Sequence, residues 1–380
     1  MYKKSTFDKR LLNDIHSSDI IKSICTTYVQ YYNNNQMKKG NMMFCFHKHH
    51  MGNDMKIPQL RILATSFCGR KCLYCRPTGE GGIGCASNEY VNIENTLKIC
   101  RLYKEKGGSE VKITGGDPVF WPELVHFVQS LKKEIGIKKV EVITRSPKIS
   151  EKVSGLIAAG LDVLNFSLDT TDRTTYEKIT GCFDYDELIS TIQGCAKAVP
   201  VKINTVILKG INDSHIKDMI TFCESVGVQQ LKLLDVINDL QDTEAGNKYR
   251  LGEFGVKRLD QLYVSLTPIC AELQQEAVKG NIVYQGGLGH PMNEFQMASG
   301  LIITIKNSEN GAWYGTICET CPSYPCHDAL MAIRLTSDNR LQYCLLNQNA
   351  SIPLEQLTPD EIEHVFTDSL EIYENAYLVE

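Results

Sequence analysis

Six short apolar runs recur between residues 59 and 237, and a helix-like segment follows each of them. Strands that alternate with helices predict a parallel sheet, and near-continuous apolar strands predict burial on both faces. Six such units favour an α/β fold, a partial (β/α)6 barrel of the TIM type with its chemistry at the C-terminal strand ends. The runs are QLRILATSF (59–67), EVKITGG (110–116), KVEVITR (139–145), VLNFSLD (163–169), VKINTVIL (201–208) and QLKLLDVI (230–237).

Polar residues gather where these predicted strands end. Three cysteines follow the first run, TGGDP follows the second, and Thr144 with Arg145 closes the third. Ser167 and Asp169 close the fourth run, and Asn204 lies on the fifth. Because the strands of a parallel barrel end on one face, we expect these residues to converge on one mouth.

The pattern changes on both sides of this core. The first 56 residues are polar and partly helix-like, and a long helix is predicted over about 255–277. GLIITIKN and RLTSDNRLQYCLL favour strands, with SDNR as a turn, and a Thr followed by an acidic turn opens a final helix. The predicted parts are an N-terminal helical extension (1–56), the barrel core (57–240), a second domain (241–350) and a C-terminal helix (351–380).

Composition limits the classes of partner. The 380-residue chain is 43% hydrophobic with a formal net charge of -5, which argues against nucleic acid and membrane surfaces as partners. A local basic pocket for an anionic small molecule stays compatible with that charge. No run approaches 18 apolar residues and the N-terminus lacks the apolar core of a signal peptide, so we expect a cytoplasmic protein.

The chain has 15 cysteines, which in a reducing compartment favour metal binding where they cluster and core packing where they are scattered. Isolated cysteines in helix-like surroundings are expected to be buried thiols. These are Cys25, Cys100, Cys182, Cys195, Cys223 and Cys270.

Cys68, Cys72 and Cys75 form a tight C-x3-C-x2-C group after the first run. Three thiolates can hold an iron–sulfur cluster through three of its irons and leave the fourth iron free for a cofactor. A structural zinc ion would need a fourth ligand, from Cys85 or from CFHKHH at 45–50.

This cysteine group resembles that of the radical S-adenosyl-L-methionine (SAM) superfamily, and TGGDP at 114–118 resembles its GGEP element, with Asp117 where Glu is usual. The resemblance implies a [4Fe–4S] cluster that binds SAM and cleaves it reductively to a 5′-deoxyadenosyl radical. That radical would abstract hydrogen from a substrate. The implied SAM-binding residues are Tyr74, Gly115, Gly116, Asp117, Pro118, Thr144, Ser167 and Asn204.

Within that superfamily, LNFSLDTTDRTTYEKITG (164–181) and VKINTVILKGIND (201–213) resemble GTP 3′,8-cyclases. The resemblance implies an auxiliary [4Fe–4S] domain in which Cys318, Cys321 and Cys344 hold a second cluster. A fourth cysteine, Cys326, lies in an insert that departs from the family, so ligation by three or by four cysteines stays open. A zinc ion at this group is the structural alternative.

The same resemblance implies substrate contacts from Arg61, Lys112, Lys202 and Arg334. Other family features are absent, because Ala332 replaces one arginine and the chain ends NAYLVE rather than in two glycines. A nucleotide-like anion from a natural-product or modified-nucleoside pathway is therefore expected. The electron donor would be a protein such as flavodoxin or ferredoxin. The alternatives are a peptide-modifying radical SAM enzyme and a non-catalytic metal-binding regulator.

Overall fold

The computed structural model describes residues 57–75, 90–236, 251–285, 288–322, 324, 326, 330–345, 347 and 350–379, and residues 48–49 as a short strand. The remaining residues lie outside this description. They include most of the expected N-terminal extension, Cys25, Cys85 and nearly all of CFHKHH.

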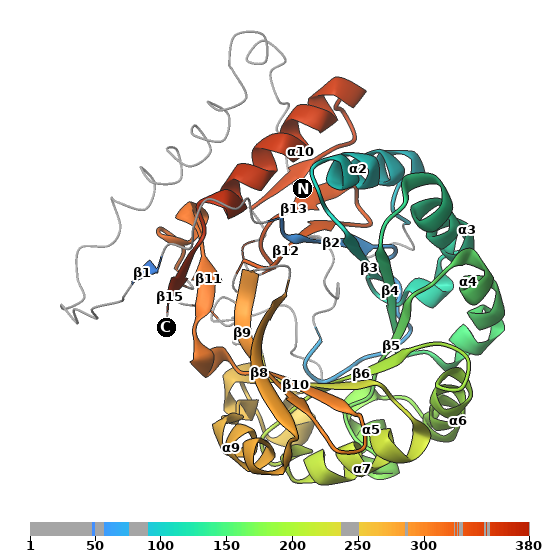
Figure 1. Ribbon diagram of the computed structural model, residues 1–380, viewed down its shortest axis with the longest axis vertical. Helices are drawn as coiled ribbons and strands as arrows, with labels where there is room; N and C mark the ends of the chain where they lie inside the picture. Colours follow the sequence, from blue (N-terminus) through green and yellow to red (C-terminus); the bar gives the residue numbers. More distant parts are fainter. Residues whose placement is uncertain are drawn as a thin grey trace.

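Six parallel strands in sequence order form the core of the fold and confirm the predicted partial barrel (Figure 1). Each begins within one residue of an apolar run identified in the sequence, and the apolar side chains of the strands are almost completely buried. The strands are β2 (Gln59–Leu63), β3 (Glu110–Thr114), β4 (Lys139–Thr144), β5 (Val163–Ser167), β6 (Val201–Val206) and β7 (Gln230–Leu234).

Helices cover the outside of the curled sheet (Figure 1). Asn92 accepts the Asn95 N–H at the start of the first one, while Gly160 and Gly227 end two others in left-handed conformation, which glycine adopts without strain. The helices are α2 (Ile93–Glu105), α3 (Leu124–Gln129), which continues as the π-helical turn η3 (Ser130–Ile135), α4 (Val153–Ala159), α5 (Arg173–Thr180), α6 (Tyr185–Cys195) and α7 (Ile216–Val226).

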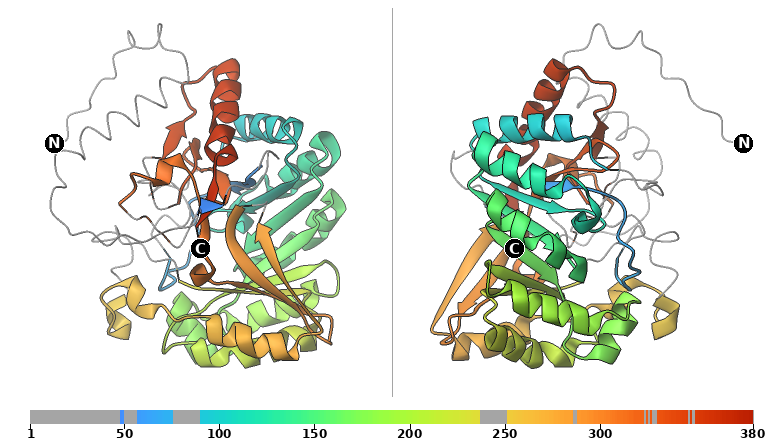
Figure 2. Two further views of the ribbon diagram at one scale, coloured as in Figure 1. Left: turned by 60° about the vertical axis from the view of Figure 1, so that its left-hand side comes forward. Right: turned by 90° about the vertical axis from the view of Figure 1, so that its right-hand side faces the viewer.

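The strands after residue 240 extend the barrel sheet at both of its edges (Figure 2). A parallel strand joins β7 on one side, another joins β2 on the other, and antiparallel strands continue outward from each. On the β7 side they are β10 (Ile302–Lys306), β9 (Leu288–Gln296) and β8 (Lys279–Gln285). On the β2 side they are β12 (Ala332–Leu335), β13 (Arg340–Gln342) and β14 (Ser351–Pro353).

The C-terminal helix is confirmed as α10 (Pro359–Glu374), with Thr358 and Glu361 forming a reciprocal capping box. Beyond it, the short strand β15 (Tyr377–Val379) pairs with β1 (Lys48–His49) and β11 (Ala312–Tyr314) in a separate small sheet. The small sheet therefore brings β15 beside β11, which leads into the segment that carries the second cysteine group.

The long helix expected over 255–277 is wrong, because α9 covers only Thr267–Glu276. Pro268 suits only the first turn of a helix since it has no N–H to donate, and Gly255 ends an earlier turn in left-handed conformation. The other short turns are η2 (Pro118–Phe120), η4 (Pro147–Glu151), η5 (Asp213–His215), η6 (Gly252–Phe254), η7 (Leu259–Leu262), η8 (Ser308–Asn310) and η9 (Thr316–Cys318).

Candidate active site

A cavity of about 590 Å³ opens inside the barrel. It brings together almost all of the residues that the sequence nominated for cofactor and substrate; Pro118, buried at the start of η2, does not line it, and neither do the four C-terminal cysteines. The nominated residues in its wall are Arg61, Cys68, Cys72, Tyr74, Cys75, Lys112, Gly115, Gly116, Asp117, Thr144, Ser167, Lys202, Asn204 and Arg334.

The glycine pair after β3 packs directly against the start of the cysteine loop. Gly116 N–H donates to Thr65 O at 2.6 Å, and Asp117 N–H donates to Phe67 O at 2.8 Å. A Cβ on Gly115 would lie 2.5 Å from Thr65 O, and one on Gly116 would lie 2.2 Å from Phe67 O. Both positions therefore require glycine because the backbones of the two loops touch.

The Asp117 carboxylate holds the loop after β4 in place. It accepts hydrogen bonds from Thr144 Oγ1 (2.7 Å), Arg145 N (2.9 Å) and Val119 N (3.1 Å), and the side chain is 1% exposed. Burial raises the pKa of Asp117, against the effect of these donors. Asp117 and Thr144 both border the cavity, but the Thr144 hydroxyl donates its hydrogen bond to Asp117.

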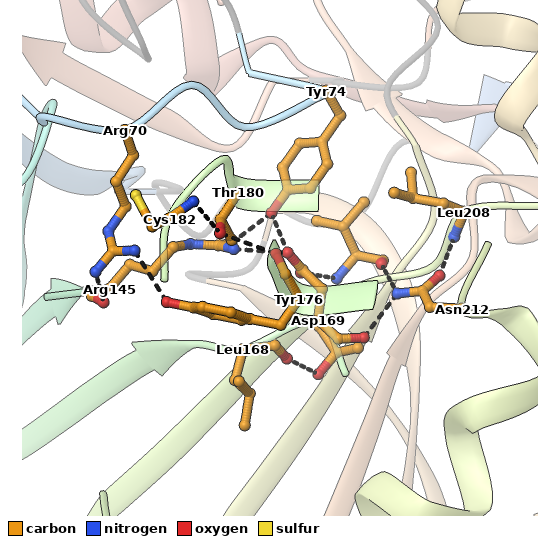
Figure 3. Close-up of polar contacts among 12 residues, drawn as sticks. Arg70, Tyr74, Arg145, Leu168, Asp169, Tyr176, Thr180, Cys182, Leu208 and Asn212 are labelled. Carbon is orange, nitrogen blue, oxygen red and sulfur yellow. Dashed lines mark hydrogen bonds and ion pairs between the residues drawn. The ribbon is translucent and has the colours of Figure 1, made fainter. Parts of the chain in front are cut away.

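A buried network fixes the far end of the cysteine loop (Figure 3). Asp169 accepts hydrogen bonds from the Tyr74 hydroxyl (2.9 Å), Arg145 Nη1 (2.7 Å) and Val206 N (3.0 Å), and Arg145 also contacts the Tyr74 hydroxyl. Asn212 donates to the backbone carbonyl of Asp169 at 2.7 Å. Strands β4, β5 and β6 thereby position the residue just before the third cysteine.

Arg70, between the first two cysteines, clamps the middle of the loop (Figure 3). Its guanidinium donates to both carboxylate oxygens of Asp184, at 2.6 and 3.1 Å, and to the Tyr176 hydroxyl and Arg145 O, each at 2.9 Å. The Arg70 side chain is only 5% exposed. The sequence analysis did not nominate Arg70, although its position between Cys68 and Cys72 pointed to a role in shaping the loop.

The three thiols of the cysteine loop border the cavity. Cys68 and Cys72 are half-buried, Cys75 is exposed, and all three face the cavity. Among the described residues, no three Cys, His, Asp or Glu side chains lie close enough to hold one metal ion. Burial, then Asp117 and Cys72, raise the pKa of Cys68 to about 12.

Ser167 and Asn204 differ from Thr144 because their polar groups remain available. They are register partners on β5 and β6, both are half-buried, and both line the cavity. Within the described part of the chain, neither side chain makes a hydrogen bond to another residue. These two side chains are placed to meet a bound molecule.

A row of charges crosses four adjacent strands of the barrel. Arg334 on β12, Arg61 on β2, Lys112 on β3 and Glu141 on β4 are successive register partners and point into the cavity. Lys112 Nζ and Lys202 Nζ each lie 3.5 Å from a carboxylate oxygen of Glu141. Burial alone would raise the pKa of Glu141, but these lysines lower it to about 2.

The opposite wall carries a second row, of which the sequence analysis nominated only Asn204. Asn204, Lys232 on β7, Thr304 on β10 and Glu294 on β9 are register partners that line the cavity, and Lys306 lies two residues beyond Thr304. In total, eight cationic and five acidic side chains line the cavity. A charged residue inside an apolar strand pattern, such as the lysine of QLKLL, was the sequence signal that could have identified this row.

The second cysteine group forms around η9, outside the barrel cavity. Burial raises the pKa of Cys318 to about 12, and the thiols of Cys344, Cys326 and Cys321 act in the same direction. Cys321 N–H donates to Cys318 O at 3.0 Å, and Asn347 N–H donates to Cys344 Sγ at 3.3 Å.

Among the scattered cysteines, Cys100, Cys195 and Cys223 are buried as expected, whereas Cys182 and Cys270 are half-buried. None of the described helices combines the length and apolar character needed to cross a membrane.

Comparison with known proteins shows which families this chain resembles. Residues 62–223 match the model of the Radical SAM superfamily. A probable GTP 3′,8-cyclase of Archaeoglobus fulgidus is 25% identical over 316 residues, 83% of this chain and 94% of the relative. GTP 3′,8-cyclases of Rhizobium etli (27%; 78% and 77% of the two chains) and Clostridium acetobutylicum (28%; 80% and 86%) are similar.

Among solved structures, Streptococcus suis SuiB bound to S-adenosylmethionine superposes with a TM-score of 0.53 at 16% identity. The match covers 96% of this chain and 73% of SuiB. At that identity the likeness supports the fold and no more.

Proposed function

Because this chain is a radical SAM enzyme, with the family's domain at residues 62–223, we propose that it removes a hydrogen atom from an anionic, nucleotide-like small molecule. The observation that carries the proposal is the row of Arg334, Arg61 and Lys112 in one wall of the cavity. Cations placed side by side repel one another unless an anion separates them, and arginine suits phosphate and carboxylate oxygens. The similarity to GTP 3′,8-cyclases supports a nucleotide as that anion.

We assign the cofactor to the mouth of the barrel. Cys68, Cys72 and Cys75 would hold a [4Fe–4S] cluster, and the cluster with SAM, when bound, supplies a 5′-deoxyadenosyl radical. Ser167 and Asn204 are placed to bind and orient the cofactor, since their polar groups face the cavity without internal partners in the described chain. The Tyr74–Arg145–Asp169 network keeps the loop in position, and flavodoxin or ferredoxin would deliver the electron.

We further propose that Cys318, Cys321, Cys326 and Cys344 hold an auxiliary [4Fe–4S] cluster. Support for the fourth ligand is the position of Cys326 beside the strand that leads into η9, where its carbonyl oxygen accepts a hydrogen bond from the Tyr314 hydroxyl at 2.9 Å. With four protein ligands, this cluster would have no iron free for substrate and would serve structure or electron transfer. Cys326→Ala should then change the signal of the second cluster in electron paramagnetic resonance. An unchanged signal and iron content would indicate ligation by three cysteines.

The decisive functional experiment measures 5′-deoxyadenosine formed by the anaerobically reconstituted protein with SAM, a reductant and a panel of candidate substrates. Nucleotides should stimulate its formation over the substrate-free rate, and Arg61→Met should abolish the stimulation without removing the basal rate. Stimulation by peptides alone would favour the peptide-modifying alternative. Absence of SAM cleavage under every condition would contradict the proposed reaction.

A further inference from the structure

Asn165 lies in the middle of β5, two residues before Ser167, and its register partner on β6 is Lys202. It lines the cavity, and its side chain is 2% exposed. Residues two apart on a strand face the same way and lie about 7 Å apart, so Asn165 and Ser167 face one cavity at two depths. Because β5 runs toward the mouth, Asn165 lies one row deeper than the level at which the cofactor is proposed to bind.

The side-chain amide of Asn165 has a fixed orientation. Its Nδ2 donates to Glu141 Oε1 at 2.7 Å. Because the Glu141 carboxyl group has a pKa of about 2, it is ionised at neutral pH and can only accept hydrogen bonds. The amide nitrogen must therefore face Glu141, and the carbonyl oxygen must face away from it. Lys112 and Lys202, each with its Nζ 3.5 Å from the Glu141 carboxylate, keep that carboxylate in place.

The carbonyl oxygen of Asn165 has no donor. Within the described chain, Asn165 Oδ1 is shielded from solvent and accepts no hydrogen bond from the protein. A buried acceptor without a donor is costly, and such groups are rare in native proteins. Because Asn165 lines a cavity, a molecule bound there can supply the missing N–H or O–H group.

We propose that Asn165 Oδ1 accepts a hydrogen bond from an uncharged donor of the substrate, either a sugar hydroxyl or an exocyclic amino group. This inference deepens the proposed function and rests on it. A carbonyl oxygen cannot bind ionised phosphate oxygens, which are themselves acceptors, so Asn165 selects a part of the substrate other than its anionic end. The donor group would lie one row below Ser167, and Asn165 would hold that part of the substrate beneath the cofactor.

The test measures binding to the anaerobically reconstituted, SAM-loaded protein by isothermal titration calorimetry. The probes are GTP and three analogues that each lack one donor: 2′-deoxy-GTP, 3′-deoxy-GTP and ITP, which has no exocyclic amino group. The wild type should bind the analogue that lacks the recognised donor roughly 5- to 20-fold more weakly than GTP. In Asn165→Leu, the same analogue and GTP should bind within about twofold of each other. Asn310→Leu is the matched control and should behave as the wild type, because the half-buried Asn310 amide donates to Asn293 outside the cavity lining.

SAM binding is the second readout, and it separates a substrate contact from a cofactor contact and from misfolding. Asn165→Leu and the smaller Asn165→Ala should both bind SAM as the wild type does, while both lose the discrimination between GTP and the analogue. Weaker SAM binding with that discrimination kept would place the donor on the cofactor and overturn the inference. Equal binding of GTP and all three analogues by the wild type would also overturn it, and the proposed function would stand. If the wild type binds no nucleotide at all, both are overturned.

Discussion

The two cysteine groups of this protein are anchored by different forces. The loop of Cys68, Cys72 and Cys75 is held by charged side chains that the barrel buries, chiefly Arg70 against Asp184 and Arg145 against Asp169. Its backbone also donates from Leu73 N to Ile179 O at 2.9 Å. Such a loop has its shape fixed by the surrounding strands and helices before any cluster binds.

In the described part of the chain, local backbone turns and two tyrosines contact the group around Cys318. Cys318 N–H donates to Gly315 O at 2.8 Å, and the Tyr314 hydroxyl donates to Cys326 O at 2.9 Å. The rings of Tyr314 and Tyr324 pack edge to face, with centroids 4.9 Å apart. The contacts described for this group are neutral, and such contacts order a loop less strongly than buried ion pairs, so we expect the second group to depend more on the proposed cluster for its final shape.

The largest effect is expected for Arg70→Met. This change removes the guanidinium from the Asp184 carboxylate, which keeps a hydrogen bond from the Tyr176 hydroxyl and is 27% exposed. The cost is therefore at most the roughly 3 to 5 kcal/mol that loss of one member of a fully buried pair brings. Urea unfolding should show that loss, and iron incorporation at the first site should slow in parallel. Arg173→Met is the matched control, because Arg173 and Asp186 form an exposed ion pair, and it should leave both measurements almost unchanged. Equal behaviour of the two variants would contradict the difference between the groups.

Acidification should weaken the barrel through Glu141. The pKa of its carboxyl group is about 2 in the folded protein, below its ordinary value of 4.5, so its contribution is complete above about pH 4.5 and is lost as the pH falls toward 2. The loss is on the order of 3 kcal/mol. Urea unfolding at pH 7 and pH 3 should show a steeper decline for the wild type than for Glu141→Gln. The same decline in both proteins would contradict this role.

A smaller effect is expected for Tyr314→Phe, which deletes the hydroxyl that donates to Cys326 O. One neutral hydrogen bond contributes about 1 kcal/mol, so thermal unfolding should shift only slightly. Iron content at the second site should fall more than the melting temperature suggests, if the tyrosine mainly places the Cys326 loop. A destabilisation as large as that of Arg70→Met would remove the distinction drawn between the two groups.

The barrel could be predicted from the sequence because its strands are buried on both faces and therefore appear as apolar runs. β9 was missed because its sequence, LGHPMNEFQ, mixes apolar residues with Pro291, His290 and a glutamate that faces the cavity. β8 was missed because its residues are largely exposed. Neither strand carries the apolar signal that identified β2 to β7.

The candidate site shows the same division. The spacing of the cysteines and the glycine pair predicted the cofactor site at the mouth of the barrel, because those residue types at those positions serve few other purposes. Lys232 and Lys306 could be assigned to the cavity wall only from the structure, because a single lysine in a strand does not reveal which face of the sheet it occupies. Arg70 acquired its role through Asp184, which lies 114 residues away in the sequence.

The most direct test of the account is iron and sulfide content with electron paramagnetic resonance after anaerobic reconstitution, with and without SAM. Wild type should contain about eight irons, and the variant with Cys68, Cys72 and Cys75 changed to alanine about four, as two four-iron clusters require. SAM should alter the signal of the wild type alone. Zinc in place of iron, or a wild-type signal indifferent to SAM, would contradict the central claim that the barrel mouth holds a SAM-binding cluster.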